Sequence, residues 1–197
     1  VYPVSQTGST GMAFEAGASG KNLTDWQFGM ASLNPRWNVS GTYMQVLPSF
    51  ISTDQDGNDE KEFLLDYFNE LPDLLSMVFL KGYQWPFDVN KIFGGSSVID
   101  LLVYQETVLK KRRVFLDYRV NPGNLEKDRD LPYASMIPEA KEYLSQAGAC
   151  FGTPIERLKH MNEPAILFYQ DHHVDLFKER LEIAVCAQHN NLSLIHI

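Results

Sequence analysis

The sequence predicts a mixed fold of helices and strands, of the α/β class with an α+β arrangement in its middle part. Three observations support this class. Extended runs occur at residues 23–32 and 43–52, helical spacing of apolar residues prevails over residues 60–178, and an extended pattern returns at 181–189. The 197 residues include 12 Phe, 9 Tyr and 3 Trp, which is enough apolar mass for a substantial core.

Turn residues define the first elements. A turn rich in Gly, Ser and Thr precedes small residues that predict a short helix at 11–17. Two strands are expected at 23–32 and 43–52, because the turn Asn34-Pro35-Arg36-Trp37 separates two extended runs. An acidic loop at 54–60 follows, and the change from a strand-rich opening to a helical middle is expected near residues 48–57.

Apolar spacing and caps predict the later elements. Four apolar residues form one face of the helix expected at 60–71, and Gly94-Gly95-Ser96-Ser97 caps the helix that follows it at 98–110. The strand at 114–119 ends at Pro122-Gly123. After the acidic loop the expected elements are helices at 60–71, 74–80 and 98–110, a strand at 114–119, helices at 133–147, 154–161 and 166–178, and an extended segment at 181–189.

The turn at residues 7–11 is the candidate cofactor-binding element. Glycines let the backbone come close to a ligand, and the start of a helix offers N–H groups and partial positive charge to a phosphate or ribose. A simple helix cap is the alternative explanation. The candidate residues are Thr7, Gly8, Ser9, Thr10 and Gly11.

Composition excludes several classes of function. The formal net charge of −8 disfavours a nucleic-acid surface, and the basic run at 110–113 is expected to complement the dipole at the end of a helix. No apolar run reaches the length of a membrane span. Cys150 and Cys186 favour a reducing, cytoplasmic location, with a disulfide between them as the alternative.

Two segments contain metal-ligand residue types, and no metal site is expected at either. The acidic loop opens like a calcium loop, but its sixth and twelfth positions are Asp59 and Leu65, where an EF-hand needs Gly and Glu. The segment 171–175 contains His172 and His173 at the expected start of a helix, where neighbouring side chains diverge.

Both ends of the chain indicate a piece of a longer protein. The chain begins without Met, and residues 192–197 resemble the translated reading frame of a transposase adapter used in sequencing libraries. We expect this tail to be non-native and without an evolved packing partner, with a natural apolar strand as the alternative.

Three segments carry a family resemblance. The run TGSTG with AGA, followed by DWQF, is similar to a TGDG…AGA…D-x-E-F pattern. The run VFLDYR at 114–119 is similar to V-Y-L-D-L-R, and LEIAVCAQHNN at 181–191 resembles the lead into A-H-Y-x-x-G-G. In this order they resemble the flavoprotein subunit of the fumarate reductase/succinate dehydrogenase family, which also includes L-aspartate oxidase.

The resemblance implies a split architecture. Residues 1–47 correspond to the end of the first segment of a Rossmann-like FAD-binding domain, and residues 48–180 to a capping domain of helices and strands. Residues 181–191 begin the return to the FAD-binding domain. The implied cofactor is FAD, and the implied partners are a small-molecule substrate and an electron-transfer partner. A cap that closes over the flavin excludes water from the reacting centre.

The sequence departs from the dicarboxylate enzymes at their charged positions. The substrate-binding His corresponds to Ser32, the Pro-Arg-Asp helix start with its proton-donating Arg corresponds to Gly95-Ser96-Ser97, and the acid of TGDG corresponds to Ser9 or Thr10. Because the two carboxylates of fumarate need cations or strong donors, a different substrate is expected.

Gln188 and His189 are the candidate catalytic residues. They stand where the resemblance implies the motif His and Tyr, and a His can donate a proton near neutral pH. Packing at a strand end is the alternative role for either residue. Two alternatives to the function also stay open: a dicarboxylate reductase with its cation relocated to Arg36 or Arg119, and a binding or structural relative without catalysis.

Overall fold

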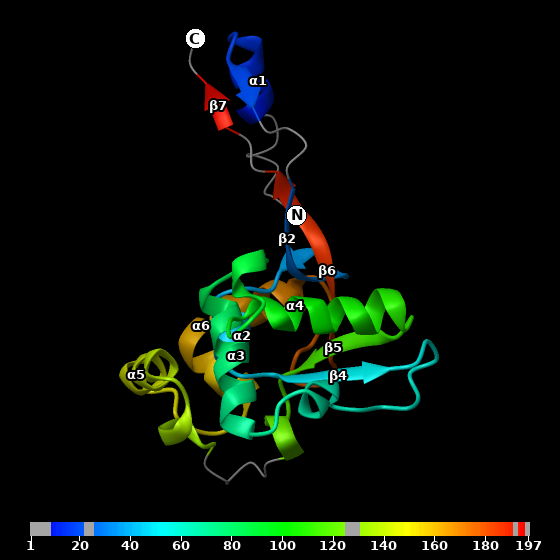
Figure 1. The fold of residues 1–197 in the computed structure, drawn as a ribbon, viewed down its shortest axis with the longest axis vertical. Helices are drawn as coiled ribbons and strands as arrows, with labels where there is room; N and C mark the ends of the chain where they lie inside the picture. The colour runs from blue at the N-terminus through cyan, green and yellow to red at the C-terminus, as the bar shows by residue number, and fades with distance from the viewer. Residues whose placement is uncertain (1–8, 22–25, 125–130, 191–192, 196–197) are drawn as a thin grey trace.

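A five-stranded antiparallel sheet organises the computed structural model, which describes residues 9–21, 26–124, 131–190 and 193–195 (Figure 1). The strand order is β3–β2–β6–β5–β4, and every strand pair among the described residues is antiparallel. With its helices, this sheet makes the fold α+β, as expected for the middle of the chain. The bounds are β2 Trp26–Ser32, β3 Trp37–Asn38, β4 Ser49–Thr53, β5 Arg113–Asp117 and β6 Leu181–Asn190.

The pairing of β2 with β6 joins the two ends of the chain. Ser32 lies opposite Ile183, and the ladder continues to Trp26 opposite Asn190. Beyond this end of the ribbon lie the helix α1, Ser9–Glu15, and the short pair of β1, Ser19–Lys21, with β7, Ser193–Ile195 (Figure 1). Three residues of the expected non-native tail therefore pair with β1.

The described residues contain five further helices, which pack beside the sheet. The longest, α6, begins with a capping box of Thr153 and Glu156 and is kinked at Asn162, ahead of Pro164, whose ring cannot continue an ideal helix. A π-helical turn, Gln105–Leu109, extends α4. The helices are α2 Thr42–Gln45, α3 Leu71–Tyr83, α4 Ser97–Tyr104, α5 Pro138–Gln146 and α6 Pro154–Asp171, with 3-10 turns at Phe63–Asp66, Val89–Lys91, Pro122–Asn124 and Tyr133–Ser135.

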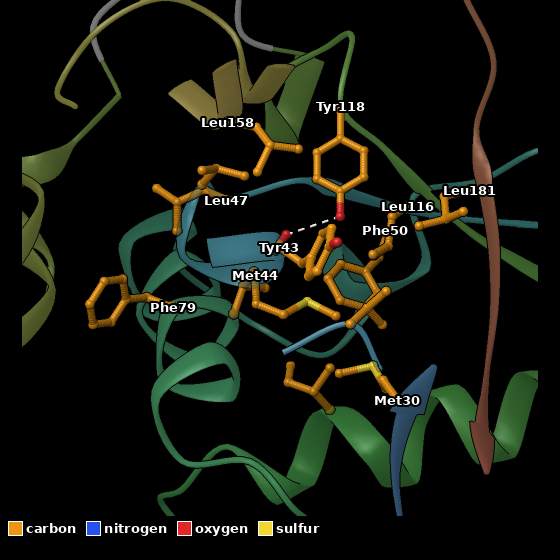
Figure 2. Close-up of a cluster of buried hydrophobic side chains, with 14 of the residues drawn as sticks. Met30, Tyr43, Met44, Leu47, Phe50, Phe79, Leu116, Tyr118, Leu158 and Leu181 are labelled. Atoms are coloured by element: carbon orange, nitrogen blue, oxygen red, sulfur yellow. Dashed lines mark hydrogen bonds between the residues drawn. The ribbon is translucent and has the colours of Figure 1, made fainter. Parts of the chain in front are cut away.

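The core lies between the helices and one face of the sheet (Figure 2). The hydroxyl of Tyr118 donates a hydrogen bond of 3.1 Å to the carbonyl of Tyr43, so this buried phenol is satisfied. Strands, α2, α3 and α6 all contribute side chains to the cluster: Met30, Tyr43, Met44, Leu47, Phe50, Phe79, Leu116, Tyr118, Leu158 and Leu181.

The prediction of a strand at 43–52 is wrong for the first half of this segment. Residues 42–45 form α2, and β4 begins only at Ser49. Leu47 has a φ of 58°, a left-handed conformation outside the range of regular strands, and Pro48 follows it. Buried contacts of Leu47 hold this turn in place, so packing decides against the local extended pattern.

Helix boundaries also differ from expectation. In place of the helix expected at 60–71, Lys61 forms a β-bridge with Ser52, residues 63–66 form a 3-10 turn, and α3 begins at Leu71. The helix expected at 133–147 starts at Pro138, since a residue before proline avoids the helical region. The helix expected at 166–178 is the second half of α6 and ends at Asp171, so 171–173 closes a helix rather than opening one.

A buried arginine ties α6 to the loops around it. Arg157 has no exposed surface, and its Nε and Nη2 donate to the carbonyl of Val46 at 3.0 and 2.9 Å. Nη1 donates to Phe151 and Gly152, and Nη2 also donates to Asn121 Oδ1. Burial lowers the pKa of Arg157 to about 10, so it still carries its charge at neutral pH.

We expect Arg157→Met to destabilise the fold by about 3 kcal/mol or more, because it leaves several buried carbonyl groups without a donor. Chemical denaturation measures the change. The matched control is Lys141→Met on the exposed side of α5, with an expected change within about 0.5 kcal/mol. Similar losses for the two variants would contradict a structural role for Arg157.

Candidate functional site

The candidate site, here called the ribbon–loop site, comprises residues 26–29 of β2, residues 186–190 of β6 and the loop 84–97. The loop is attached to the edge of the ribbon, since the Phe87 N–H donates to the Phe28 carbonyl at 2.8 Å. The indole of Trp85 lies directly over Gly29, where any Cβ would overlap the ring. Only glycine therefore lets the loop lie this close to β2.

Gln188 occupies an irregularity in the ribbon. Phe28 pairs with Ala187 and Gln27 pairs with His189, so Gln188 is the extra residue of a β-bulge. Bulges redirect side chains and are common beside active sites. The two candidate catalytic residues thus lie in sequence at the bulge, opposite Gln27.

The candidate cofactor turn lies at the same end of the molecule. Ser9, Thr10 and Gly11 form the first turn of α1, which Figure 1 shows beyond the outer end of the β2–β6 ribbon. Thr7 and Gly8 lie outside the described residues. No heavy atom lies within 4 Å of a Cβ built on Gly11, so the backbone there borders open space.

The serines that the sequence resemblance aligns with charged positions have structural partners. The buried Ser32 hydroxyl donates to the Pro35 carbonyl and accepts from the Tyr169 hydroxyl at 2.9 Å. Ser97 Oγ accepts from the Asp88 N–H at 2.9 Å. Ser32 pairs with Ile183, five residues before the bulge, which is about 16 Å along a strand. The structure therefore does not bring Ser32 to Gln188.

A buried ion pair joins α3 to the first turn of α4. Lys81 Nζ on α3 and Asp100 Oδ2 on α4 are 2.5 Å apart, with side-chain exposures of 0% and 1%. Burial lowers the pKa of Lys81 and raises that of Asp100, and Asp100 Oδ1 has no hydrogen-bond partner. The sequence analysis did not predict this pair. Lys81 follows Leu74 by seven residues, which places it on the apolar face of α3, and a lysine on such a face indicates a buried partner of opposite charge.

Arg119 lies at the opposite end of the sheet from the bulge. Its guanidinium donates to both carboxylate oxygens of Asp117, at 2.9 and 2.7 Å, and to the Lys178 carbonyl. Arg180 also donates to Asp117 and forms a two-bond pair with Glu60. Arg180 precedes Gln188 by eight residues, about 26 Å along β6. Arg119 therefore cannot serve a substrate at the bulge.

Arg36 lies in the turn between β2 and β3, next to Trp37, which pairs with Ser32. Burial raises the pKa of the Cys186 thiol, and the charge of Arg36 opposes that rise. Cys186 lies two residues before Gln188. The backbone of Arg36 therefore lies at the Ser32 end of β2 and not at the bulge. Cys150 and Cys186 are both free thiols.

Glu62 is an unusual carboxylate beside the Asp117 network. Both of its oxygens accept from the Gly123 N–H, at 3.1 and 3.0 Å. Burial, with a smaller contribution from the charge of Asp117, raises the pKa of Glu62 to about 7 against an ordinary value of 4.5. Its charge therefore changes near neutral pH.

The described residues contain no group of three or more His, Cys, Asp or Glu side chains arranged to hold a metal ion. His172 Nδ1 is 2.7 Å from the Phe168 carbonyl at the end of α6. Within the same described ranges, no helix combines the length and apolar character needed to cross a membrane.

Comparison with known proteins identifies no relative. No protein-family model matches the chain, no curated protein matches it, and no solved structure matches it.

We expect Gly29→Ala to displace Trp85 and detach the loop from β2, with a destabilisation of about 1–3 kcal/mol. Thermal unfolding and tryptophan fluorescence of the folded state measure the two effects. Gly11→Ala is the control, because open space surrounds Gly11 and alanine favours a helix by about 0.5–1 kcal/mol. Unchanged fluorescence and stability in Gly29→Ala would rule out the Trp85 contact.

We expect Glu62→Gln to change how stability depends on pH. With a folded pKa of about 7 and an unfolded value of 4.5, the folded state binds the extra proton between these values, so wild-type stability falls as pH rises through that window. Neutral Gln avoids the loss. Urea denaturation should show the variant about 2 kcal/mol more stable near pH 8 and little changed near pH 4.

The matched control for this prediction is Glu163→Gln, which removes an exposed carboxylate on α6. It should shift stability equally little at both pH values. A Glu62→Gln variant that is less stable than wild type at the alkaline pH would show that the charged form is the favoured one.

Proposed function

We propose that this chain is an internal part of an FAD-dependent oxidoreductase of the fumarate-reductase type, acting on a substrate other than fumarate or succinate. A small-molecule substrate and an electron-transfer partner belong to the same proposal. So does a division in which residues 1–47 and 181–191 belong to a Rossmann-like FAD-binding domain and residues 48–180 form its cap, in a cytoplasmic protein.

The pairing of β2 with β6 is the observation that carries the proposal. A split cofactor domain requires the segment before the insertion to meet the segment after it, although about 150 residues separate them. Trp26–Ser32 and Leu181–Asn190 meet in this way. They contain all but the first residue of the D-x-E-F resemblance and all but the last residue of the resemblance to the lead into the A-H-Y-x-x-G-G motif. If the two short motifs resembled the family only by chance, there would be no reason for them to lie side by side in the sheet.

The residues at this end are compatible with a flavin. The first turn of α1 offers backbone N–H groups, and open space beside Gly11 leaves room for a phosphate or ribose. FAD, when bound, supplies hydride transfer. The strands β4 and β5 from the expected cap share one sheet with β2 and β6, so the proposed boundary between the cap and the FAD-binding domain runs through this sheet.

The roles of the chain's own residues follow from the bulge and the loop. His189 would hold or donate a proton at its imidazole, and Gln188 would orient a polar substrate group by hydrogen bonds. The loop 84–97, attached through Phe87 and Trp85, would exclude water from one side of the site.

The partners of the serines support a substrate other than fumarate. Reduction of fumarate builds negative charge beside a carboxylate and needs preorganised cations and a proton donor. Ser32 and Ser97 are neutral, and both are engaged in structural hydrogen bonds. The second candidate function, a dicarboxylate reductase, would need the Arg36 side chain to reach the bulge, and the observation in its favour is that the charge of Arg36 opposes the rise in the pKa of Cys186.

We expect the protein encoded by the gene extended in both directions to purify with stoichiometric flavin and to show negligible fumarate reduction. Each lost donor costs about 10²–10³ in rate, so turnover with reduced viologen and fumarate should be lower than for family enzymes by at least about 100-fold. An anaerobic assay measures it, and bleaching of the flavin by dithionite is the control for a competent cofactor.

The two failures of this experiment have different meanings. An extended protein without flavin would reject the oxidoreductase proposal. Flavin with rapid fumarate reduction would favour the dicarboxylate reductase, and in that case Arg36→Leu should remove the activity while Arg119→Leu should leave it in place.

A further inference from the structure

A small pocket lies between α3 and α5. Its volume is about 210 Å³, and its lining combines aromatic rings with carboxylates: Phe79, Tyr83, Glu139, Glu142, Tyr143 and Gln146. Figure 1 shows α5 beside α3 and apart from the β2–β6 ribbon, so this pocket is separate from the ribbon–loop site. Nothing in the proposed oxidoreductase chemistry uses it.

Helical spacing gathers the lining residues on two facing surfaces. On α5, Glu139 is followed by lining residues three, four and seven positions later, which places all four on one face. On α3, Phe79 and Tyr83 are four residues apart and also share a face. The pocket is thus formed by regular elements.

Three aromatic rings line the pocket. Phe79 is 1% exposed, and the ring of Tyr83 is nearly parallel to it, at an interplanar angle of 16° and a centroid distance of 6.5 Å. The ring of Tyr143 is inclined at 62° to Phe79, with centroids 5.5 Å apart. Tyr83 is 65% exposed and Tyr143 is 36% exposed, so both present ring surface to a ligand.

The charge of the pocket has one sign. Glu139 and Glu142 supply two exposed carboxylates, and Gln146 Nε2 donates to Glu142 Oε1 at 2.9 Å, which orients that carboxylate. None of the six lining residues is cationic. An anion would be repelled here, and a neutral apolar ligand would leave the carboxylates unused.

We infer that this pocket binds an organic cation, an ammonium group with an apolar collar, such as a quaternary ammonium compound or the end of a lysine side chain. The negative faces of aromatic rings attract cations, and the carboxylates add a longer-range attraction that salt weakens. The small volume suits a single cationic group rather than a large ligand. A free molecule and a peptide side chain share this chemistry.

Titration monitored by NMR tests the inference, with choline as the cationic probe and its neutral isostere 3,3-dimethyl-1-butanol as the matched comparison. Choline should perturb signals of α3 and α5 and bind at least about tenfold more tightly than the isostere. N-acetyl-lysine methylamide is the third probe, and its affinity relative to choline distinguishes a peptide side chain from a free quaternary ammonium compound.

Variants separate the pocket from general charge effects. The double variant Glu139→Gln and Glu142→Gln, and the single variant Tyr143→Leu, should each weaken choline binding at least about fivefold. Glu163→Gln, which removes an exposed carboxylate from α6, should change nothing. Equal binding of choline and its isostere, absence of saturable binding, or equal weakening by Glu163→Gln would each overturn the inference.

Discussion

The β2–β6 ladder is the interaction on which the rest of the structure depends. It occupies the middle of the five-stranded sheet and joins segments about 150 residues apart. Closing so long a loop costs entropy before any contact is gained. The ladder therefore needs its buried face, against which α4 packs and to whose core the other helices contribute side chains. The functional proposal rests on the same ladder, because it pairs a strand near the start of the chain with a strand near its end.

Buried polar groups fix how the helices attach to this sheet. Arg157 donates hydrogen bonds to loop carbonyls around α6, and the ion pair of Lys81 with Asp100 connects α3 to α4. At the end of β5, Asp117 forms ion pairs with Arg119 and Arg180. Each buried charge is expensive without its partner. Moving a helix away from its partner would leave a buried charge unpaired. These interactions therefore fix the position of each helix more than they add to the net stability of the fold.

Local signals in the sequence predicted part of this arrangement. Pattern and caps predicted extended runs at 23–32 and 181–189 and a helix at 98–110. These correspond to β2, β6 and α4 with its π-helical turn, and the α+β class of the middle is confirmed. The left-handed Leu47 depends on core packing, which no local pattern encodes. The bulge at Gln188 depends on strand register, and the Lys81–Asp100 pair joins separate helices. Gln188 and His189 could be proposed as site residues from the sequence. The contact between Gly29 and Trp85 beside them could not be predicted, because it joins segments that are brought together only by the fold.

Native-state hydrogen exchange, followed by mass spectrometry on this chain, tests the central role of the ladder most directly. Peptides covering 26–32 and 181–190 should exchange together and only with global unfolding, as slowly as the core of α3. The exposed α1 should exchange much faster, since it lies outside the sheet. Rapid exchange in 181–190 while α3 stays protected would show that the two ends of the chain are not joined, and the account would fail.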